Sequence, residues 1–182
     1  FMNDKKVIRQ LTNAGCGHTL HHHGVFSKDS CWIVFDARNE DSKIGESAQI
    51  GLLHVATAEQ RLLYDLPEAS VYGPGVGAAS FNPKADSVVF IHGLQGANAQ
   101  EPYAITRRTA VAVDLNCPMR AVPLDGRDLE APYTAGTLRG GTHSHAWDCS
   151  GKLLSFTYND ALVEPELRMV GVMIPAESTI GT

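Results

Sequence analysis

A short phrase that recurs three times constrains the fold of this chain more than any other feature. Each copy has an aromatic residue, then a polar turn, then an apolar run that ends in Phe. The copies begin at Phe26, Phe81 and Trp147. Self-similarity at a long period is the signature of a repeat architecture, in which each copy is one supersecondary unit. The repeat therefore predicts an all-β fold, a β-propeller built from four-stranded antiparallel blades.

The segments around the three phrases have the length and the strand signals of propeller blades. In the first unit we expect strands at 21–26, 31–38, 49–56 and 60–65, with a polar loop at 39–46. In the second unit we expect strands at 76–81, 87–92, 103–108 and 109–115, and in the third at 142–147, 152–158 and 168–174. Four such strands in about 45 residues make one blade. The expected blades span residues 18–66, 72–116 and 138–176, and the last is incomplete.

Three blades do not close a ring, because propellers have about four to eight blades. An open ring would expose sheet faces and unpaired strand edges. We therefore expect residues 1–182 to form part of a ring of about six or seven blades. The remaining blades would come from a longer parent chain or from another copy of this one. A plain β-sandwich made of the same strands is the alternative fold.

Composition argues against several classes of function. The net charge of -5 offers no basic face of the kind that nucleic acid requires. No apolar run reaches the length of about 18 residues that a membrane-spanning helix needs, and no signal peptide is recognisable. The four cysteines are scattered without a CxxC pair, which is typical of reduced thiols. These features predict a cytoplasmic protein, or a periplasmic one if an N-terminal signal has been removed.

Histidines gather where the first strand of a blade is expected, and in a propeller this strand lines the axial channel. When the phrases are aligned on their aromatic residues, His22 in the first blade is the counterpart of His143 in the third. His143 and His145 are two positions apart on one strand, so their side chains are expected to share a face. Imidazole is a common metal ligand, so we expect His22, His143 and His145 to hold Mn, Zn, Fe or Ni. In the alternative, these histidines hydrogen-bond the backbone at a crowded channel mouth.

Three further candidates are weaker. His92 ends an apolar strand and could reach the same rim, which makes it a candidate ligand-binding residue. Arg38 is a second ligand-binding candidate, although an ion pair with Asp36 between blades is the favoured role. Arg107 and Arg108 are expected to form a solvated turn rather than an anion site. The glycine-rich segments at 15–17, 73–77 and 140–141 predict close approach of the backbone before each first strand.

Several stretches resemble the YidR-like family of TolB-type propellers, for which no activity is assigned. They are residues 9–12 and 32–36, residues 89–93, and residues 138–145 and 155–160. TolB-type repeats carry an aromatic-Ser-Pro-Asp-Gly-Lys turn before an apolar strand that ends in Phe, and the three copies here are degenerate forms of it. The resemblance implies a longer parent chain and a binding protein, with a small-molecule or saccharide ligand in the histidine-lined channel.

The step from His143 to His145 also resembles oligogalacturonate lyases, which are propellers that hold a divalent metal through channel histidines. This resemblance implies an alternative function, a metal-dependent lyase that acts by β-elimination on an acidic sugar. The metal would bind the sugar carboxylate, and a base would take the α-proton. His23 and Arg139 are the expected catalytic residues, with Arg139 assisting with charge.

Overall fold

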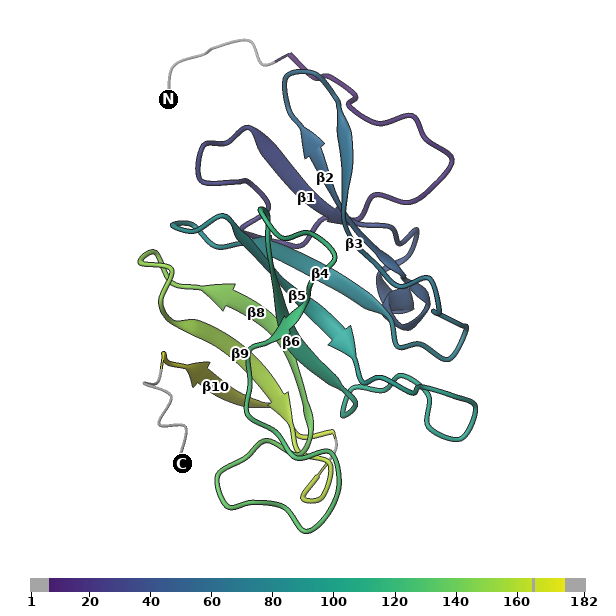
Figure 1. The fold of residues 1–182 in the computed structure, drawn as a ribbon, viewed down its shortest axis with the longest axis vertical. Coiled ribbons are helices and arrows are strands. Elements are labelled where there is room, and N and C mark those ends of the chain that lie inside the picture. The colour runs from purple at the N-terminus through teal and green to yellow at the C-terminus, as the bar shows by residue number, and fades with distance from the viewer. Residues whose placement is uncertain (1–6, 165, 176–182) are drawn as a thin grey trace.

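The structure is a computed structural model, and it describes residues 7–164 and 166–175. The described residues form ten strands in three antiparallel sheets, with one short 3-10 helix, η1 (Asp41–Glu46) (Figure 1). Within each sheet, strands that are neighbours in space are neighbours in sequence. Consecutive up-and-down sheets of this kind are propeller blades. The all-β, partial propeller fold that the repeat predicted is therefore confirmed.

Most strands lie within a few residues of their expected positions. The first sheet holds β1 (Trp32–Asp36), β2 (Gln49–His54) and β3 (Gln60–Asp65). The second holds β4 (Val76–Phe81), β5 (Ser87–Gly93), β6 (Arg108–Asp114) and β7 (Val122–Pro123). The third holds β8 (Gly141–Trp147), β9 (Leu154–Asn159) and β10 (Met169–Met173).

The strand expected at residues 103–108 is wrong, because this segment is a loop that ends in a turn. The Tyr103 amide donates to the Tyr72 carbonyl at 2.7 Å, and the Arg107 amide donates to the Ala104 carbonyl at 2.9 Å. Pro102 precedes the segment and has no amide hydrogen to give to a sheet. The third strand of this blade is therefore β6, and the short β7 takes the outermost place.

The first blade departs from expectation at its inner edge and in its loop. Residues 21–26 are not a continuous strand, because this region joins β1 only through two isolated bridges, Thr19 with Asp36 and Phe26 with Ile33. The expected polar loop at 39–46 contains η1. The inner edge of the first blade is therefore irregular where the second and third blades have the full strands β4 and β8.

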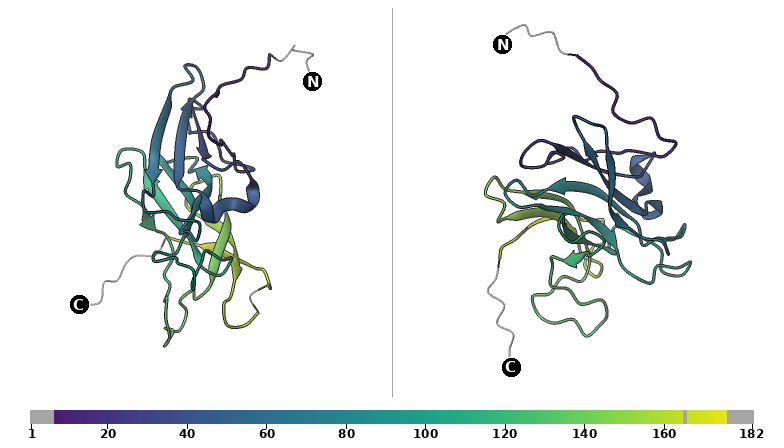
Figure 2. Two further views of the ribbon diagram at one scale, coloured as in Figure 1. Left: turned by 90° about the vertical axis from the view of Figure 1, so that its right-hand side faces the viewer. Right: turned by 45° about the horizontal axis from the view of Figure 1, so that its top comes forward.

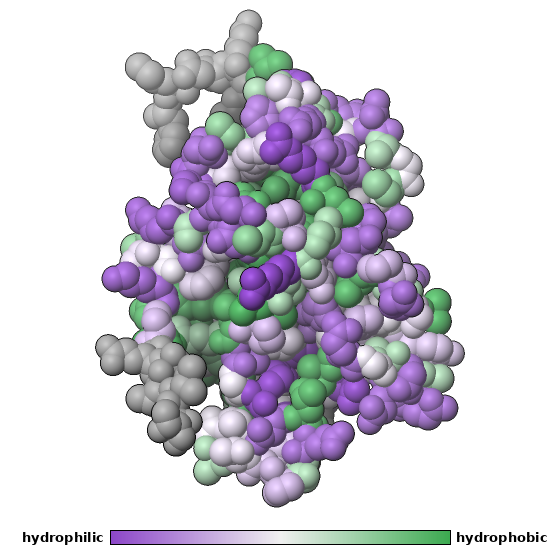
Figure 3. All heavy atoms as spheres, viewed as in Figure 1, coloured by the Kyte–Doolittle hydropathy of each residue, from purple (hydrophilic) through white to green (hydrophobic). Residues whose placement is uncertain are grey.

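Two apolar cores hold the sheets face to face. Phe90 belongs to the core between the first and second sheets, and its neighbour Val89 belongs to the core between the second and third. Successive residues of a strand point to opposite faces, so the run 88–91 of β5 is apolar because both faces of the strand are covered. Figure 2 shows the first sheet, in blue, and the third, in green and yellow, on opposite sides of the second. Figure 3 shows hydrophobic side chains near the centre of one face, bordered by hydrophilic ones.

Glycines at the ends of strands permit the close approach that the sequence predicted. A Cβ atom on Gly93 would lie 1.6 Å from the Pro74 carbonyl oxygen, and one on Gly141 would lie 1.7 Å from that of Ile105. Real Cβ atoms do not approach backbone so closely, so only glycine fits at either position. The contact at Gly141 places the start of β8 against the loop that leads into β6.

Asn82 connects the turn of the second blade to that of the third, and replacing it with Ala is expected to destabilise the fold. Its Oδ1 accepts hydrogen bonds from the amides of Lys84 at 2.8 Å and Ala85 at 3.0 Å, and its Nδ2 donates to the Gly151 carbonyl at 2.9 Å. Losing these bonds should lower the free energy of unfolding by about 2 kcal/mol, measured by urea denaturation. The control is Asn116→Ala, at an exposed turn, where we expect less than about 0.5 kcal/mol. Equal losses in the two variants would contradict this role for Asn82.

Candidate binding site at the inner strands

The first strands of the second and third blades share one irregularity. The pairing of β4 with β5 shifts after Gly77, and the pairing of β8 with β9 shifts after His143. At these bulges Ala78 and Ser144 each have a φ of 55°. The two residues occupy equivalent positions in the aligned phrases, so the alignment of these two blades is structurally sound. A bulge re-aims the side chains around it, so regular alternation does not govern the positions of His143 and His145.

Both of the predicted histidines beside the bulge in β8 are buried. His145 is 1% exposed, and neither of its ring nitrogens has a hydrogen-bond partner among the described residues. His143 is 9% exposed, and in the same part of the chain its Nδ1 has no partner. Burial lowers the pKa of His145 to about 3 and that of His143 to about 4. Both imidazoles are therefore neutral at pH 7.

Two arginines share the surroundings of His143. Arg108, at the start of β6, is buried; its Nη1 donates to the Tyr103 hydroxyl at 3.3 Å, and its Nε has no partner. The charges of Arg108 and of Arg168, an exposed residue just before β10, both lower the pKa of His143. Within residues 7–164 and 166–175, neither arginine forms an ion pair with a carboxylate. The surroundings of His143 are therefore positively charged.

Asp125 lies near His145, but its charge is already compensated. The Asp125 carboxylate raises the pKa of His145, against the larger effect of burial. Arg127 donates to it from Nε at 2.8 Å and from Nη2 at 2.7 Å, and the Thr109 hydroxyl donates to it at 2.8 Å. Asp125 is therefore unavailable as a counter-ion for Arg108.

The first blade contributes His21 to this region, whereas the sequence alignment favoured His22. The His21 Nε2 is buried without a partner, and its pKa is lowered to about 4, mainly by burial and then by the charges of His23 and His22. The charge of His21 in turn lowers the pKa of His145, which places the two side chains near each other. His22 and His23 are both exposed. The alignment could not show this, because residues 20–24 do not follow strand alternation.

The predicted metal ligands His22, His143 and His145 are not assembled as a metal centre. No group of three His, Cys, Asp or Glu side chains in the described part of the chain is arranged to hold a metal ion. His143 and His145 lie close to each other, but His22 is on the surface. The metal site therefore stays a prediction.

Arg139 and Arg38 are both engaged with carboxylates, although the charges of Arg38 and Asp36 still act on the pKa of His21. Arg139 donates from Nε to Asp160 at 3.1 Å, and none of its contacts among the described residues is with a histidine. Arg38 forms a buried ion pair with Asp36, whose Oδ2 also accepts from the Ala78 amide of the second blade at 2.8 Å. The predicted ion pair of Asp36 with Arg38 is confirmed, but both residues belong to the first blade, and the link to the second blade is the hydrogen bond from the Ala78 amide.

Arg108 is the residue of the site that sequence reasoning missed. The expectation of a solvated turn suits Arg107, which pairs with the exposed Glu101 at 3.2 Å. Arg108 instead begins β6 and pairs in register with Gly93. Its place at the head of the apolar run 109–113 was the available signal, because a strand that is buried on both faces also buries its first residue.

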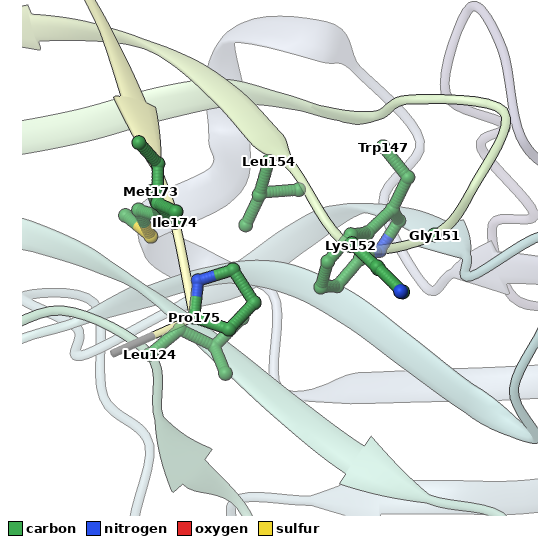
Figure 4. Close-up of a pocket in the computed structure, with 8 residues that line it drawn as sticks. All are labelled: Leu124, Trp147, Gly151, Lys152, Leu154, Met173, Ile174 and Pro175. Atoms are coloured by element: carbon green, nitrogen blue, oxygen red, sulfur yellow. The ribbon is translucent and has the colours of Figure 1, made fainter. Parts of the chain in front are cut away.

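An apolar pocket of about 280 Å³ lies beside Trp147, the last residue of β8, and Leu154, the first residue of β9. Figure 4 shows Leu154 between Met173 on one side and Trp147 on the other, with Pro175 and Leu124 nearby. Apart from Lys152, no charged residue lines this pocket among those described. The pocket therefore offers no chemistry beyond apolar packing.

The comparisons agree with the resemblance found in the sequence. The family described as "Protein of unknown function (DUF3748)" matches residues 75–181, more than half of the chain. The uncharacterised protein YidR of Escherichia coli (strain K12) is 34% identical over 176 residues, which is 93% of this chain but only 40% of that relative. The crystal structure of TolB from Acinetobacter baumannii aligns with a TM-score of 0.41 at 12% identity, over 84% of this chain and 43% of that one. No described helix is long and apolar enough to cross a membrane. The chain belongs to the DUF3748 family.

Proposed function

We propose that this chain is part of a TolB-type propeller that binds an anionic ligand at an inner-strand cluster, defined as His21, Arg108, His143 and His145. The observation that carries the proposal is a set of buried nitrogens that have no hydrogen-bond partner within residues 7–164 and 166–175: His21 Nε2, Arg108 Nε, His143 Nδ1, and both ring nitrogens of His145. Buried polar groups are nearly always hydrogen-bonded, and each exception calls for an explanation. A ligand with several acceptor oxygens would supply the missing partners.

The charge of the inner-strand cluster favours an anion. Arg108 and Arg168 lie close enough to His143 to lower its pKa, and Asp125 is already paired with Arg127. A guanidinium binds a carboxylate through two parallel hydrogen bonds, and neutral imidazoles can each donate one more. A carboxylate, such as that of an acidic sugar, therefore matches the free groups.

A metal-dependent lyase is the second candidate function. The imidazoles of His143 and His145 are neutral and have free nitrogens, which is the form that binds Mn, Zn, Fe or Ni. A metal there would act as a Lewis acid on a sugar carboxylate. Further ligands, and the expected contributions of His23 and Arg139, would have to come together in the complete ring. The positive charge of Arg108 opposes a cation at this place, so the anion site is the better supported function.

The proposal also includes further blades that complete the propeller ring. Val170 and Val172 pair with Thr157 and Ser155 on β9, so these four side chains share one face of the third sheet. Val170 is 90% exposed and Val172 is 52% exposed, so this outer part of the face is open among the described residues. The chain spans 40% of the length of YidR. We expect blades from a longer parent chain to pack on this face and complete the ring.

Calorimetric titration with two matched sugars tests the anion site. Galacturonate carries a carboxylate and galactose does not, so we expect only galacturonate to bind. Arg108→Gln should weaken galacturonate binding about tenfold or more, because a charge-assisted hydrogen bond is lost. The control is Arg107→Gln, which removes the neighbouring arginine and should leave binding unchanged. Equal binding of both sugars, or equal losses in both variants, would contradict the proposal.

Native mass spectrometry with metal analysis separates the two candidate functions. Stoichiometric metal that is lost in His145→Gln and retained in His54→Gln, at a half-buried imidazole hydrogen-bonded to Thr57, would favour the metal centre. Metal-free protein that binds galacturonate would favour the anion site.

A further inference from the structure

A second cavity lies between the first and second blades, and none of the four residues of the inner-strand cluster lines it. Its volume is about 530 Å³, within the range of small-molecule sites. Tyr64 on β3 and His92 on β5 line it, together with residues of β6 and the segment around β7. Much of its wall is apolar, from side chains that include Leu94, Val111 and Ala121. The cavity can therefore enclose an apolar ring system.

The hydrogen bonds of His92 determine whether the polar groups of this cavity can donate a hydrogen bond to a ligand or accept one from it. The His92 Nδ1 lies 2.5 Å from the Gly93 carbonyl oxygen, and a carbonyl only accepts, so Nδ1 carries the proton. Burial lowers the pKa of His92, so the ring is neutral and its Nε2 has no proton. The Tyr64 hydroxyl, 3.0 Å away, therefore donates to Nε2. With its proton used in this way, the Tyr64 oxygen can only accept from a ligand.

The charges that line the cavity are paired with each other. Arg127 uses Nε and Nη2 on Asp125 and Nη1 on the Gly140 carbonyl, at 2.7 Å for the last contact. The Thr109 hydroxyl also donates to Asp125. A charged ligand would therefore find no free counter-ion in this wall, and would lose its hydration on entering.

We propose that this cavity binds an uncharged molecule with an apolar ring body and a hydroxyl group, and that the hydroxyl donates its hydrogen bond to the Tyr64 oxygen. The chemical class is a neutral alcohol or phenol. None of the cluster residues lines this cavity, and its charges are paired, so the proposal does not depend on the function proposed for the inner-strand cluster.

Three bicyclic probes test this proposal by calorimetry on the purified protein. 2-Naphthol has the ring and the donor, 2-methoxynaphthalene lacks the donor, and 2-naphthoate carries a charge. We expect 2-naphthol to bind, and 2-methoxynaphthalene to bind roughly fivefold more weakly, as for one lost hydrogen bond. 2-Naphthoate should bind more weakly still. Absence of 2-naphthol binding, or tighter binding of 2-naphthoate, would overturn the proposal.

Two variants test the place of binding. Tyr64→Phe keeps the ring and removes the hydroxyl oxygen, so the advantage of 2-naphthol over 2-methoxynaphthalene should shrink, with His92 Nε2 left as the acceptor in this wall. Ala121→Phe fills part of the cavity and leaves Tyr64 and His92 unsubstituted, and it should weaken both probes. It remains informative if Tyr64→Phe folds poorly. Tyr72→Phe, at a tyrosine outside the cavity, and His145→Gln, in the other site, should leave 2-naphthol binding unchanged. Unchanged 2-naphthol binding in both Tyr64→Phe and Ala121→Phe would overturn the assignment.

Discussion

Replacing Asp36 with Ala is expected to lower the free energy of unfolding by about 3–5 kcal/mol, because it leaves a buried charge unpaired. Arg38 donates to Asp36 from Nε at 2.6 Å and from Nη2 at 2.9 Å, and the Ala78 amide donates to the same carboxylate. The side chains of Arg38 and Asp36 are only 5% and 0% exposed. Without the carboxylate, a guanidinium and an amide lose their partner at the seam between two blades. Urea denaturation measures the loss.

The chain contains a matched control for this ion pair. Arg61 and Glu59 are also two residues apart and lie at a similar distance, 2.7 Å, but their side chains are 58% and 50% exposed. Exposed pairs contribute little, so Glu59→Ala should cost less than about 1 kcal/mol. The double variant Asp36→Ala with Arg38→Met removes both charges and should recover part of the loss. Similar losses for Asp36→Ala and Glu59→Ala would show that burial does not set the strength of the pair.

Strand positions could be predicted from the sequence where neighbouring residues form a clear pattern of apolar runs and polar turns. The phrase at 80–91 places a polar turn between two apolar runs, and β4 and β5 lie on either side of it. The segment 103–108 has residues suited to a strand, but Pro102 and hydrogen bonds within the loop determine its course. Residues 19–26 pair with β1 at only two bridges. Whether such a segment forms a strand depends on backbone pairing with residues far away in the sequence, which its own amino-acid composition does not predict.

The candidate site was predictable only in part, for a related reason. His143 and His145 stood out because polar residues at the start of an inner strand have no ordinary core role. Arg108 and His21 join them through packing between blades and through an irregular backbone, and neither leaves a periodic pattern in the sequence. The bulge at Ser144, a residue with positive φ that is not glycine, also has no sequence signal that would separate it from a regular strand.

Acid is expected to destabilise the fold through His145, over the range from pH 6.5 down towards pH 3. Burial lowers the folded-state pKa of His145 from its ordinary value of 6.5 to about 3. Below pH 6.5 the imidazole of His145 binds a proton in the unfolded chain but not in the folded chain. The contribution of neutral His145 to stability is therefore complete above pH 6.5 and is lost as the pH falls. One pKa unit corresponds to about 1.4 kcal/mol, so the loss from His145 by pH 4 is on the order of 3 kcal/mol. Urea denaturation at pH 7, 6, 5 and 4 measures it.

The contribution of His145 is the difference between the protein and its His145→Gln variant in how steeply the free energy of unfolding changes with pH. His21 and His143, whose folded-state pKa values are about 4, add to the slope in both proteins, and so does Asp148, whose pKa of about 2 affects the acid end. The variant should therefore lose less stability between pH 6.5 and 4, whereas His22→Gln, at an exposed histidine, should follow the original protein. Equal slopes in all three would contradict burial of a neutral His145. An anion bound beside His145 favours its charged form and raises its pKa, so saturating galacturonate should flatten the dependence of stability on pH in the original protein. The effect on His145→Gln should be smaller, because only His21 and His143 remain beside the anion.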